Sequence, residues 1–224
     1  MVAAFTVALL AGAQTAMANS VVAGDIIKFG DRNGSPGGEF LANVNPGTAG
    51  AWAFVTFCLQ KTEYIDFTTN FVVDAVTDYA TSDPAGPLPG GRGGDASGHD
   101  PLDARTAWLF TQFTNGSLAG YDGSATSANR LQNAIWMIEQ EIAIDATNAY
   151  YNLANASGWT NIGDVRVLNL KRWVAASNGT PGYWVESQDQ LTRSVPEPSS
   201  LLLFGFSLAA ITAARVRSRK TSQA

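Results

Sequence analysis

Residues 51–59 read AWAFVTFCL, a run in which every side chain except one threonine is apolar or aromatic. A short run of this kind, with aromatic and β-branched residues, is typical of a buried strand. We therefore expect 51–59 to form a central strand covered on both faces, with the rest of the sheet arranged around it.

The sequence around this run has strand character on both sides. Strands are predicted for 24–30, 40–44, 63–67 and 70–79, where apolar residues alternate with polar ones or cluster between turn signals. A turn rich in Gly, Asp and Asn separates the first two, and 81–98, rich in Gly, Pro and Asp, is predicted to be a long exposed loop.

Helical periodicity begins near residue 100. Asp100 is predicted to cap a first helix with Pro101 in its first turn, and Asn115-Gly116 to end it. A second helix starts near 124–127 and runs to about Ile144, with an apolar stripe at steps of three and four. A third, short helix is predicted for 145–156.

The last part before the tail returns to strand character, at 164–170 and 183–191. The order of strands, then helices, then strands predicts an α+β fold. We expect a single domain built on an antiparallel β-sheet or sandwich, with an inserted helical segment that covers one side.

The end of the chain has three parts in a fixed order. Pro196-Glu197-Pro198 comes first, the apolar run Leu201 to Ala214 second, and the basic cluster at 215–220 third. This arrangement resembles the PEP-CTERM sorting signal of exported bacterial proteins. The resemblance implies a precursor held transiently in the inner membrane until an exosortase-type protease removes the tail. The product would then lie at the cell envelope surface or outside the cell.

The physical chemistry of the tail agrees with this expectation. As a helix, the 14 residues from Leu201 to Ala214 would span roughly 21 Å, at about 1.5 Å per residue. Ser199, Ser200 and the following arginines are needed to reach the roughly 30 Å of a bilayer core, so the predicted transmembrane sorting helix is 199–214. The basic cluster places the C-terminus in the cytoplasm and the preceding domain outside.

The beginning of the chain also reads as a targeting segment. Val2 to Ala13 is apolar, and Ala16-Met17-Ala18 forms a small-x-small cleavage site before Asn19. The predicted organisation is therefore a signal peptide at 1–18, an exported domain at 19–194 and the sorting signal at 195–224.

The charge and the rare residues exclude several classes of function. Four of the 14 basic residues and one of the 19 acidic residues lie in the tail, which leaves 10 and 18, a net charge of −8. So acidic a domain is not expected to bind nucleic acid. The single histidine, His99, and the single cysteine, Cys58, exclude an ordinary structural zinc site. No Gly-x-Ser-x-Gly elbow occurs, and we predict no cofactor, no metal and no enzymatic activity.

Two short segments contain the candidate reactive residues. Cys58 lies in Thr56-Phe57-Cys58-Leu59-Gln60, and Gln132 lies in Leu131-Gln132-Asn133-Ala134-Ile135-Trp136. The pair resembles the thioester domains of bacterial surface adhesins, with Leu131 where that family often has threonine. The resemblance implies that the sulfur of Cys58 attacks the side-chain amide of Gln132 and releases ammonia. An internal thioester remains, which an amine on a partner can open to form a covalent adhesion bond.

The residues by themselves leave alternatives open. A thiolate is a good nucleophile and a carboxamide supplies an acyl carbon with a leaving group, while Phe57, Trp108 and Trp136 are available to shield the product from water. Equally, Cys58 can be a small buried hydrophobe and Gln132 a solvent-facing helix residue. A local bond from Cys58 to Gln60 is a third option.

Two alternative functions accompany these alternative roles of Cys58 and Gln132. The first is a passive structural or exopolysaccharide-associated biofilm matrix protein with a free buried Cys58. The second is a carbohydrate-active enzyme with paired carboxylates, for which Glu139 and Glu141, two apart on a helix, are not a natural pair.

Overall fold

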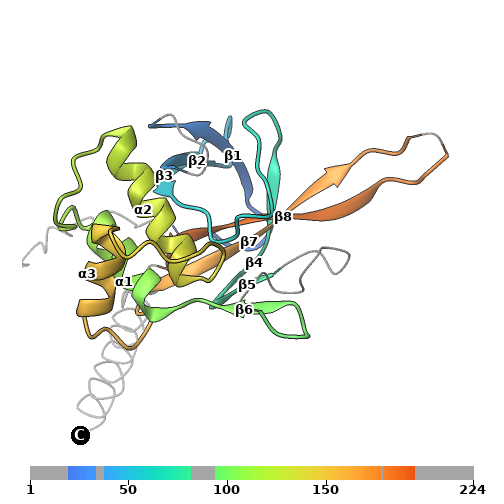
Figure 1. Cartoon of the computed structure of the whole chain (residues 1–224). Coiled ribbons are helices and arrows are strands. Elements are labelled where there is room, and N and C mark those ends of the chain that lie inside the picture. Colours follow the sequence, from blue (N-terminus) through green and yellow to red (C-terminus); the bar gives the residue numbers. More distant parts are fainter. Residues whose placement is uncertain (1–19, 34–37, 82–93, 178, 195–224) are drawn as a thin grey trace, which may run out of the picture. The chain divides into compact units, whose positions relative to one another are not determined.

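Six antiparallel strands form the main sheet in the computed structural model, shown in Figure 1. In spatial order they are β3 (Trp52–Thr56), β2 (Phe40–Val44), β1 (Ile26–Asp31), β4 (Phe71–Thr77), β7 (Val165–Val174) and β8 (Tyr183–Arg193). A second, two-stranded sheet pairs β5 (Tyr79–Thr81) with β6 (His99–Pro101). The fold is therefore α+β with antiparallel sheets, as the order of elements predicts.

The structure describes residues 20–33, 38–81, 94–177 and 179–194, and Ser20–Ser194 form one compact unit. The predicted signal peptide, the sorting residues Pro196, Glu197 and Pro198, and the predicted transmembrane helix at 199–214 lie outside these residues. Most of the predicted loop at 81–98 does so as well. Within the described ranges, no helix has the length and apolar character needed to cross a membrane.

Three helices lie between β6 and β7 in the chain and are gathered on one side of the sheet (Figure 1). They are α1 (Ala104–Thr114), α2 (Ala125–Ile138) and α3 (Ala149–Ala156). Each begins after a polar cap whose side chain accepts a backbone N–H of the first turn, as free N-terminal amides require. The caps are Asp103, Ser124 and Asn148.

Three predicted helix boundaries are wrong. The third helix begins at Ala149, after the cap Asn148, and not at Asp145. The other two differences have local reasons. Asp100 and Pro101 lie in β6, where Asp100 pairs with Ala80, so the first helix begins only after Asp103. The second helix ends at Ile138 rather than near Ile144. Gln140 adopts a φ of 64°, a left-handed conformation that an α-helix cannot continue through.

The run at 51–59 does not form a central strand covered on both faces. β3 is the last strand in the order of the sheet, and Trp52 to Val55 are only partly buried or exposed. Complete burial begins at Thr56. The predicted strand at 63–67 is also absent: these residues form bends and irregular chain.

The three residues after Thr56 join the two ends of the sheet. Leu191 donates its backbone N–H to the carbonyl of Phe57, and Leu59 donates to the carbonyl of Asp189, both at 3.1 Å. The outermost strands β3 and β8 therefore meet, and the sheet curls round to close on itself. This contact determines the surroundings of Phe57, Cys58 and Leu59, because it places β8 beside them.

Side chains alternate across this short extension, as they do along any strand. Phe57 and Leu59 face a core shared with the three helices, with Val165, Val167 and Leu191 of the sheet beneath. Cys58 faces a second core inside the curled sheet, with Phe71, Leu168 and Trp136 among its members. Because α2 contributes to both cores, it lies directly against the extension.

Candidate functional site

The structure brings Cys58 and Gln132 into direct contact, 74 residues apart in the chain. The backbone N–H of Cys58 donates to Oε1 of Gln132 at 2.9 Å, and Nε2 of Gln132 donates to the carbonyl oxygen of Cys58 at 2.8 Å. Cys58 is completely buried and Gln132 is 1% exposed. The two residues that the sequence pattern singles out therefore form one buried site.

The burial of Gln132 follows from the packing of α2. Leu131, Ala134 and Ile135 around it are fully buried, so this part of the helix is covered on a wide face. The interpretation of Gln132 as a solvent-facing residue is wrong. Its carboxamide instead satisfies the free backbone edge of the extension, just as a neighbouring strand would.

A third residue, Gln190 of β8, reaches the sulfur. Its Nε2 lies 3.2 Å from the Sγ of Cys58 and also 3.3 Å from the carbonyl of Gln188. Cys58 and Gln190 are bridge partners, and the two backbone bonds that flank them make this a non-hydrogen-bonded pair, in which side chains approach closely. Sequence reasoning missed Gln190 because this pairing joins segments 132 residues apart.

Burial has a strong effect on the thiol. Removal from water raises the pKa of Cys58 to about 12, and the hydrogen bond from Gln190 lowers it in part. The sulfur is therefore a neutral thiol in the resting protein at neutral pH, and its negative form needs local stabilisation.

The side-chain amide of Gln60 has different hydrogen-bond partners from that of Gln132. Its Nε2 donates to the carbonyl of Thr81, and its Oε1 accepts the backbone N–H of Asp189. Both ends of its amide are thus bound to backbone groups other than those of Cys58. Of these two glutamines, Gln132 is the one whose carboxamide hydrogen-bonds to Cys58.

The predicted aromatic shield is present in part. Phe57 is completely buried and Trp136 is 8% exposed, and Trp136 belongs to the same core as Cys58. Trp108 is only partly buried and packs against the other core, on the helical side. Apolar side chains cover the sulfur, and water is kept from it.

Several buried carboxyl groups lie near the ends of the same segments. Burial raises the pKa of Glu139 to about 8, helped by the charges of Asp100 and Asp103, and burial followed by the charge of Glu141 raises that of Asp100 to about 7. Glu139 accepts the backbone N–H of Asp103 at 3.3 Å, and Glu141 accepts that of Lys61 at 3.0 Å. These contacts hold loops in place. Among the described residues, no group of three or more His, Cys, Asp or Glu is placed to hold a metal ion.

The burial of Glu139 was also missed, although a signal for it exists in the sequence. Glu139 follows the buried Ile135 by four residues and therefore continues the covered face of α2.

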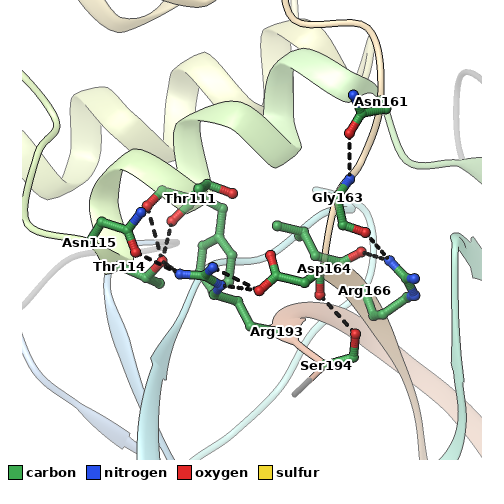
Figure 2. A network of polar contacts seen from close by, with 11 residues as sticks. Thr111, Thr114, Asn115, Asn161, Gly163, Asp164, Arg166, Arg193 and Ser194 are labelled. Atoms are coloured by element: carbon green, nitrogen blue, oxygen red, sulfur yellow. Dashed lines mark hydrogen bonds and ion pairs between the residues drawn. The ribbon is translucent and has the colours of Figure 1, made fainter. Parts of the chain in front are cut away.

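A polar network holds the last residues of the described unit (Figure 2). Arg193 of β8 binds Asp164 through Nε at 2.9 Å and Nη2 at 2.7 Å. Its Nη1 donates to Asn115 and Thr114 at the end of α1. Ser194 then donates both its backbone N–H and its hydroxyl to the carbonyl of Asp164. The chain is tied to the domain up to the residue where the sorting signal begins.

An aromatic pair lies on the hairpin of β7 and β8, which extends away from the rest of the sheet (Figure 1). Trp173 and Trp184 are 53% and 49% exposed, with their rings edge to face and 5.2 Å apart. Tyr183 beside them is half-exposed, and Lys171 lies 5.3 Å from the ring of Trp184. The hairpin therefore presents flat apolar rings beside a cation.

Comparison with known proteins identifies the tail. The PEP-CTERM protein-sorting motif matches residues 194–220. No curated protein and no solved structure matches the chain. The sorting signal predicted from Pro196-Glu197-Pro198 and the residues that follow is thus confirmed.

The motif indicates how the protein is exported and processed. The chain is an exported protein that is sorted by an exosortase and is anchored transiently in the membrane before release. The match covers the tail alone, and the activity of the preceding unit has to be argued from its site.

Proposed function

We propose that the exported domain attaches covalently to an amine-bearing partner through an internal thioester between Cys58 and Gln132. The observation that carries the proposal is the two-point contact of the Gln132 carboxamide with the backbone of Cys58 inside a closed apolar core. That contact brings the carboxamide of Gln132 to the backbone of the single cysteine in the sequence, which supports a role for Gln132 as the acyl donor. The domain would act as a single-use coupling device at the cell surface, without enzymatic turnover.

Formation of the thioester is a balanced acyl transfer. The sulfur of Cys58 attacks the Cδ carbon of Gln132, the S–C bond forms and the C–N bond of the carboxamide breaks. The proton of the thiol passes to the departing nitrogen, which leaves as ammonia. No oxidant, metal or cofactor takes part.

The backbone supplies the electrostatic help that this step needs. During attack, negative charge develops on Oε1 of Gln132, the atom that already accepts the N–H of Cys58 at 2.9 Å. A backbone donor held in that position stabilises the tetrahedral intermediate as an oxyanion hole does. The carbonyl of Cys58 holds the nitrogen that will leave.

When the thioester is opened, the sulfur of Cys58 becomes the leaving group and an amine becomes the nucleophile. A primary amine, such as a lysine of a partner, attacks the same carbon, the C–S bond breaks, and a proton from the amine ends on the sulfur. The product is an amide between Gln132 and the partner, with Cys58 restored as a thiol. Because water is excluded from the buried site, hydrolysis competes poorly with an amine that is placed there.

Peptide mapping of the full, exported chain tests the proposal. Trypsin cuts after Arg32 and Lys61, which leaves Cys58 and Gln60 in one peptide, 33–61, while cuts after Arg130 and Arg166 leave Gln132 in 131–166. A thioester to Gln132 joins these two peptides with a loss of about 17 Da, the ammonia that departs. A bond to Gln60 would give the same loss within one peptide.

Two variants and one reagent complete the test. The joined peptides should be absent from Cys58→Ala and Gln132→Ala, and methylamine should separate them, label Gln132 and expose one thiol. Separate peptides of unchanged mass in the untreated protein would overturn the proposal and favour a matrix protein with a free thiol. Glutamate at position 132 would instead record a thioester that water had opened.

A second candidate function rests on the exposed aromatic pair of the hairpin. Trp173 and Trp184 offer flat faces on which sugar rings can stack, and Lys171 and Asp74, which form an ion pair beside them, offer hydrogen-bonding groups. We propose that this hairpin holds exopolysaccharide, whether or not the thioester forms.

Affinity electrophoresis in gels containing soluble neutral or acidic polysaccharides tests this second proposal. The chain should be retarded by at least one polysaccharide, and Trp173→Ala with Trp184→Ala should abolish the retardation. Trp159→Ala is the matched control, because this tryptophan is also exposed but lies outside the hairpin. Equal migration of the parent and the hairpin variant would overturn it.

A further inference from the structure

We infer that Gln190 is the third reacting-site residue of the thioester. Its Nε2–H holds and stabilises the Cys58 sulfur, and its Oε1 receives an N–H of the ammonia that leaves and of the amine that later attacks. The inference rests on the proposed thioester, and it assigns a catalytic residue that neither sequence motif contains.

The position of the Gln190 side chain is the first argument. Cys58 and Gln190 form a non-hydrogen-bonded bridge pair, so both side chains rise on the same face between the two strands. Nε2 lies 3.2 Å from Sγ and is further held by the carbonyl of Gln188. The donor is thus fixed in place before any reaction begins.

The unused oxygen is the second argument. Gln190 is completely buried, and its Oε1 has no hydrogen-bond partner among the described residues. A buried acceptor without a partner is destabilising, and native proteins keep few of them. Since Oε1 and Nε2 share one carbon atom, this free acceptor lies beside the sulfur.

The chemistry of the two steps needs both ends of this amide. The sulfur carries negative charge when it attacks Gln132 and again when an amine expels it, and burial makes that charge costly. A donor on the sulfur offsets part of the cost. The nitrogen that leaves as ammonia and the amine that attacks pass through the same region in opposite directions, and each carries an N–H for Oε1.

The acceptor at Oε1 of Gln190 favours an amine over a thiol as the nucleophile. A nitrogen nucleophile can donate one N–H to Oε1 of Gln190 while its lone pair points at the acyl carbon. A thiol has only one weak donor, which it loses on attack. Primary amines are therefore favoured over thiols at this site.

The test compares Gln190→Met with Gln188→Met in the full exported chain. Both residues are buried glutamines on the same strand, but the side chain of Gln188 donates to the carbonyl of Gln60 and not to the sulfur. Methionine has a similar length and removes the polar ends. Unfolding in urea shows whether each variant keeps its fold.

Two rates are measured by mass spectrometry: formation of the joined peptides after synthesis, and their separation by methylamine. Gln190→Met should slow both by roughly ten- to a hundredfold, the effect of one hydrogen bond to a charged atom. Gln188→Met should change neither. Wild-type rates in Gln190→Met would overturn the inference and leave the thioester standing.

A spectroscopic readout separates this inference from the proposed function. The chain has one cysteine, so Gln132→Ala gives a single S–H stretching band in the infrared. Adding Gln190→Met should shift that band, and adding Gln188→Met should not. If the wild-type chain forms no joined peptides, the proposed function fails. A band unmoved by Gln190→Met would then overturn the contact with the sulfur as well.

Discussion

The thiol of Cys58 is protected by its surroundings rather than by its own chemistry. Its carbon and sulfur atoms are completely buried, and the pKa lies near 12 instead of the ordinary 9.0. Very little thiolate is therefore present at neutral pH. Reactivity has to come from contacts made within the site.

A first prediction concerns labelling of this thiol. In Gln132→Ala, which cannot form the thioester, iodoacetamide at pH 8 should modify folded Cys58 at least about a hundredfold more slowly than the same chain in urea. Both burial and the raised pKa act in this direction. Equal rates in the folded and unfolded chain would contradict the buried position of Cys58.

The carboxyl group of Glu139 should make stability depend on pH. Its pKa is raised from 4.5 to about 8, mainly by burial, so the folded state holds a proton that the unfolded state loses. The stabilising effect is complete below pH 4.5 and is lost as the pH rises toward 8. Asp100, raised to about 7, acts in the same direction.

The second prediction follows from this shift. Between pH 5 and pH 8 the free energy of unfolding should fall, and Glu139→Gln should remove roughly 2–4 kcal/mol of that fall. Urea unfolding at the two pH values measures it. Asp122→Asn is the control, because the pKa of Asp122 is lowered to about 2 and the group does not titrate in this range. A fall of unchanged size in Glu139→Gln would show that other groups cause it.

At the scale of elements, polar side chains join the sheet to the helical segment. Arg193 of β8 is one of them, since it reaches Asp164 before β7 and the last residues of α1 at once (Figure 2). Hydrogen bonds to a charged group of this kind contribute more than neutral ones.

The third prediction is that Arg193→Met lowers the free energy of unfolding by about 1–2 kcal/mol. The loss arises because Asp164 and Asn115 both lose their partner. Arg166→Met is the matched control: its guanidinium donates to the carbonyls of Gly163 and Val165, within three residues (Figure 2). Urea midpoints for the two variants should differ, and equal midpoints would speak against the network as a link between elements.

Most helices and strands could be predicted from the local sequence. Where a prediction failed, the cause lies either in neighbouring residues or in contacts with distant parts of the chain. The strand at Phe40–Val44 has the predicted bounds, and the two last strands and the three helices are present. The run at 51–59 failed as a central strand, because its hydrophobicity serves two purposes. Trp52 and Phe54 pack, partly buried, against the core inside the curled sheet, whereas Phe57 and Leu59 bond to β8 through their backbones.

At the scale of the whole molecule, export and sorting govern where the domain works. The PEP-CTERM motif at 194–220 begins at the residue that the Arg193 network secures. The matched motif thus begins at the last residue of the compact unit Ser20–Ser194.

The fourth prediction concerns this address. Replacing Pro196, Glu197 and Pro198 by alanine, in a host that makes an exosortase, should leave the tail on the protein and the protein in the membrane fraction. The reason is that the protease no longer finds its motif. Intact mass of the membrane-bound and released protein measures the outcome, with Pro181→Ala, outside the motif, as control. Release of the altered chain with its tail removed would contradict the assignment.

The sequence by itself determined the export route, the α+β class and the two residues of the candidate site. The export route and the fold class depend on local signals, namely the order of apolar, small and charged residues. The two site residues were found from the short motifs around Cys58 and Gln132. Tertiary structure decided what surrounds the sulfur. The closure of β3 onto β8 brings Gln190 to Cys58, and the packing of α2 buries Gln132. The sequence next to Gln190 gives no sign of a partner 132 residues away. Contacts of that kind depend on how strands pair in space, and a linear pattern carries no such information.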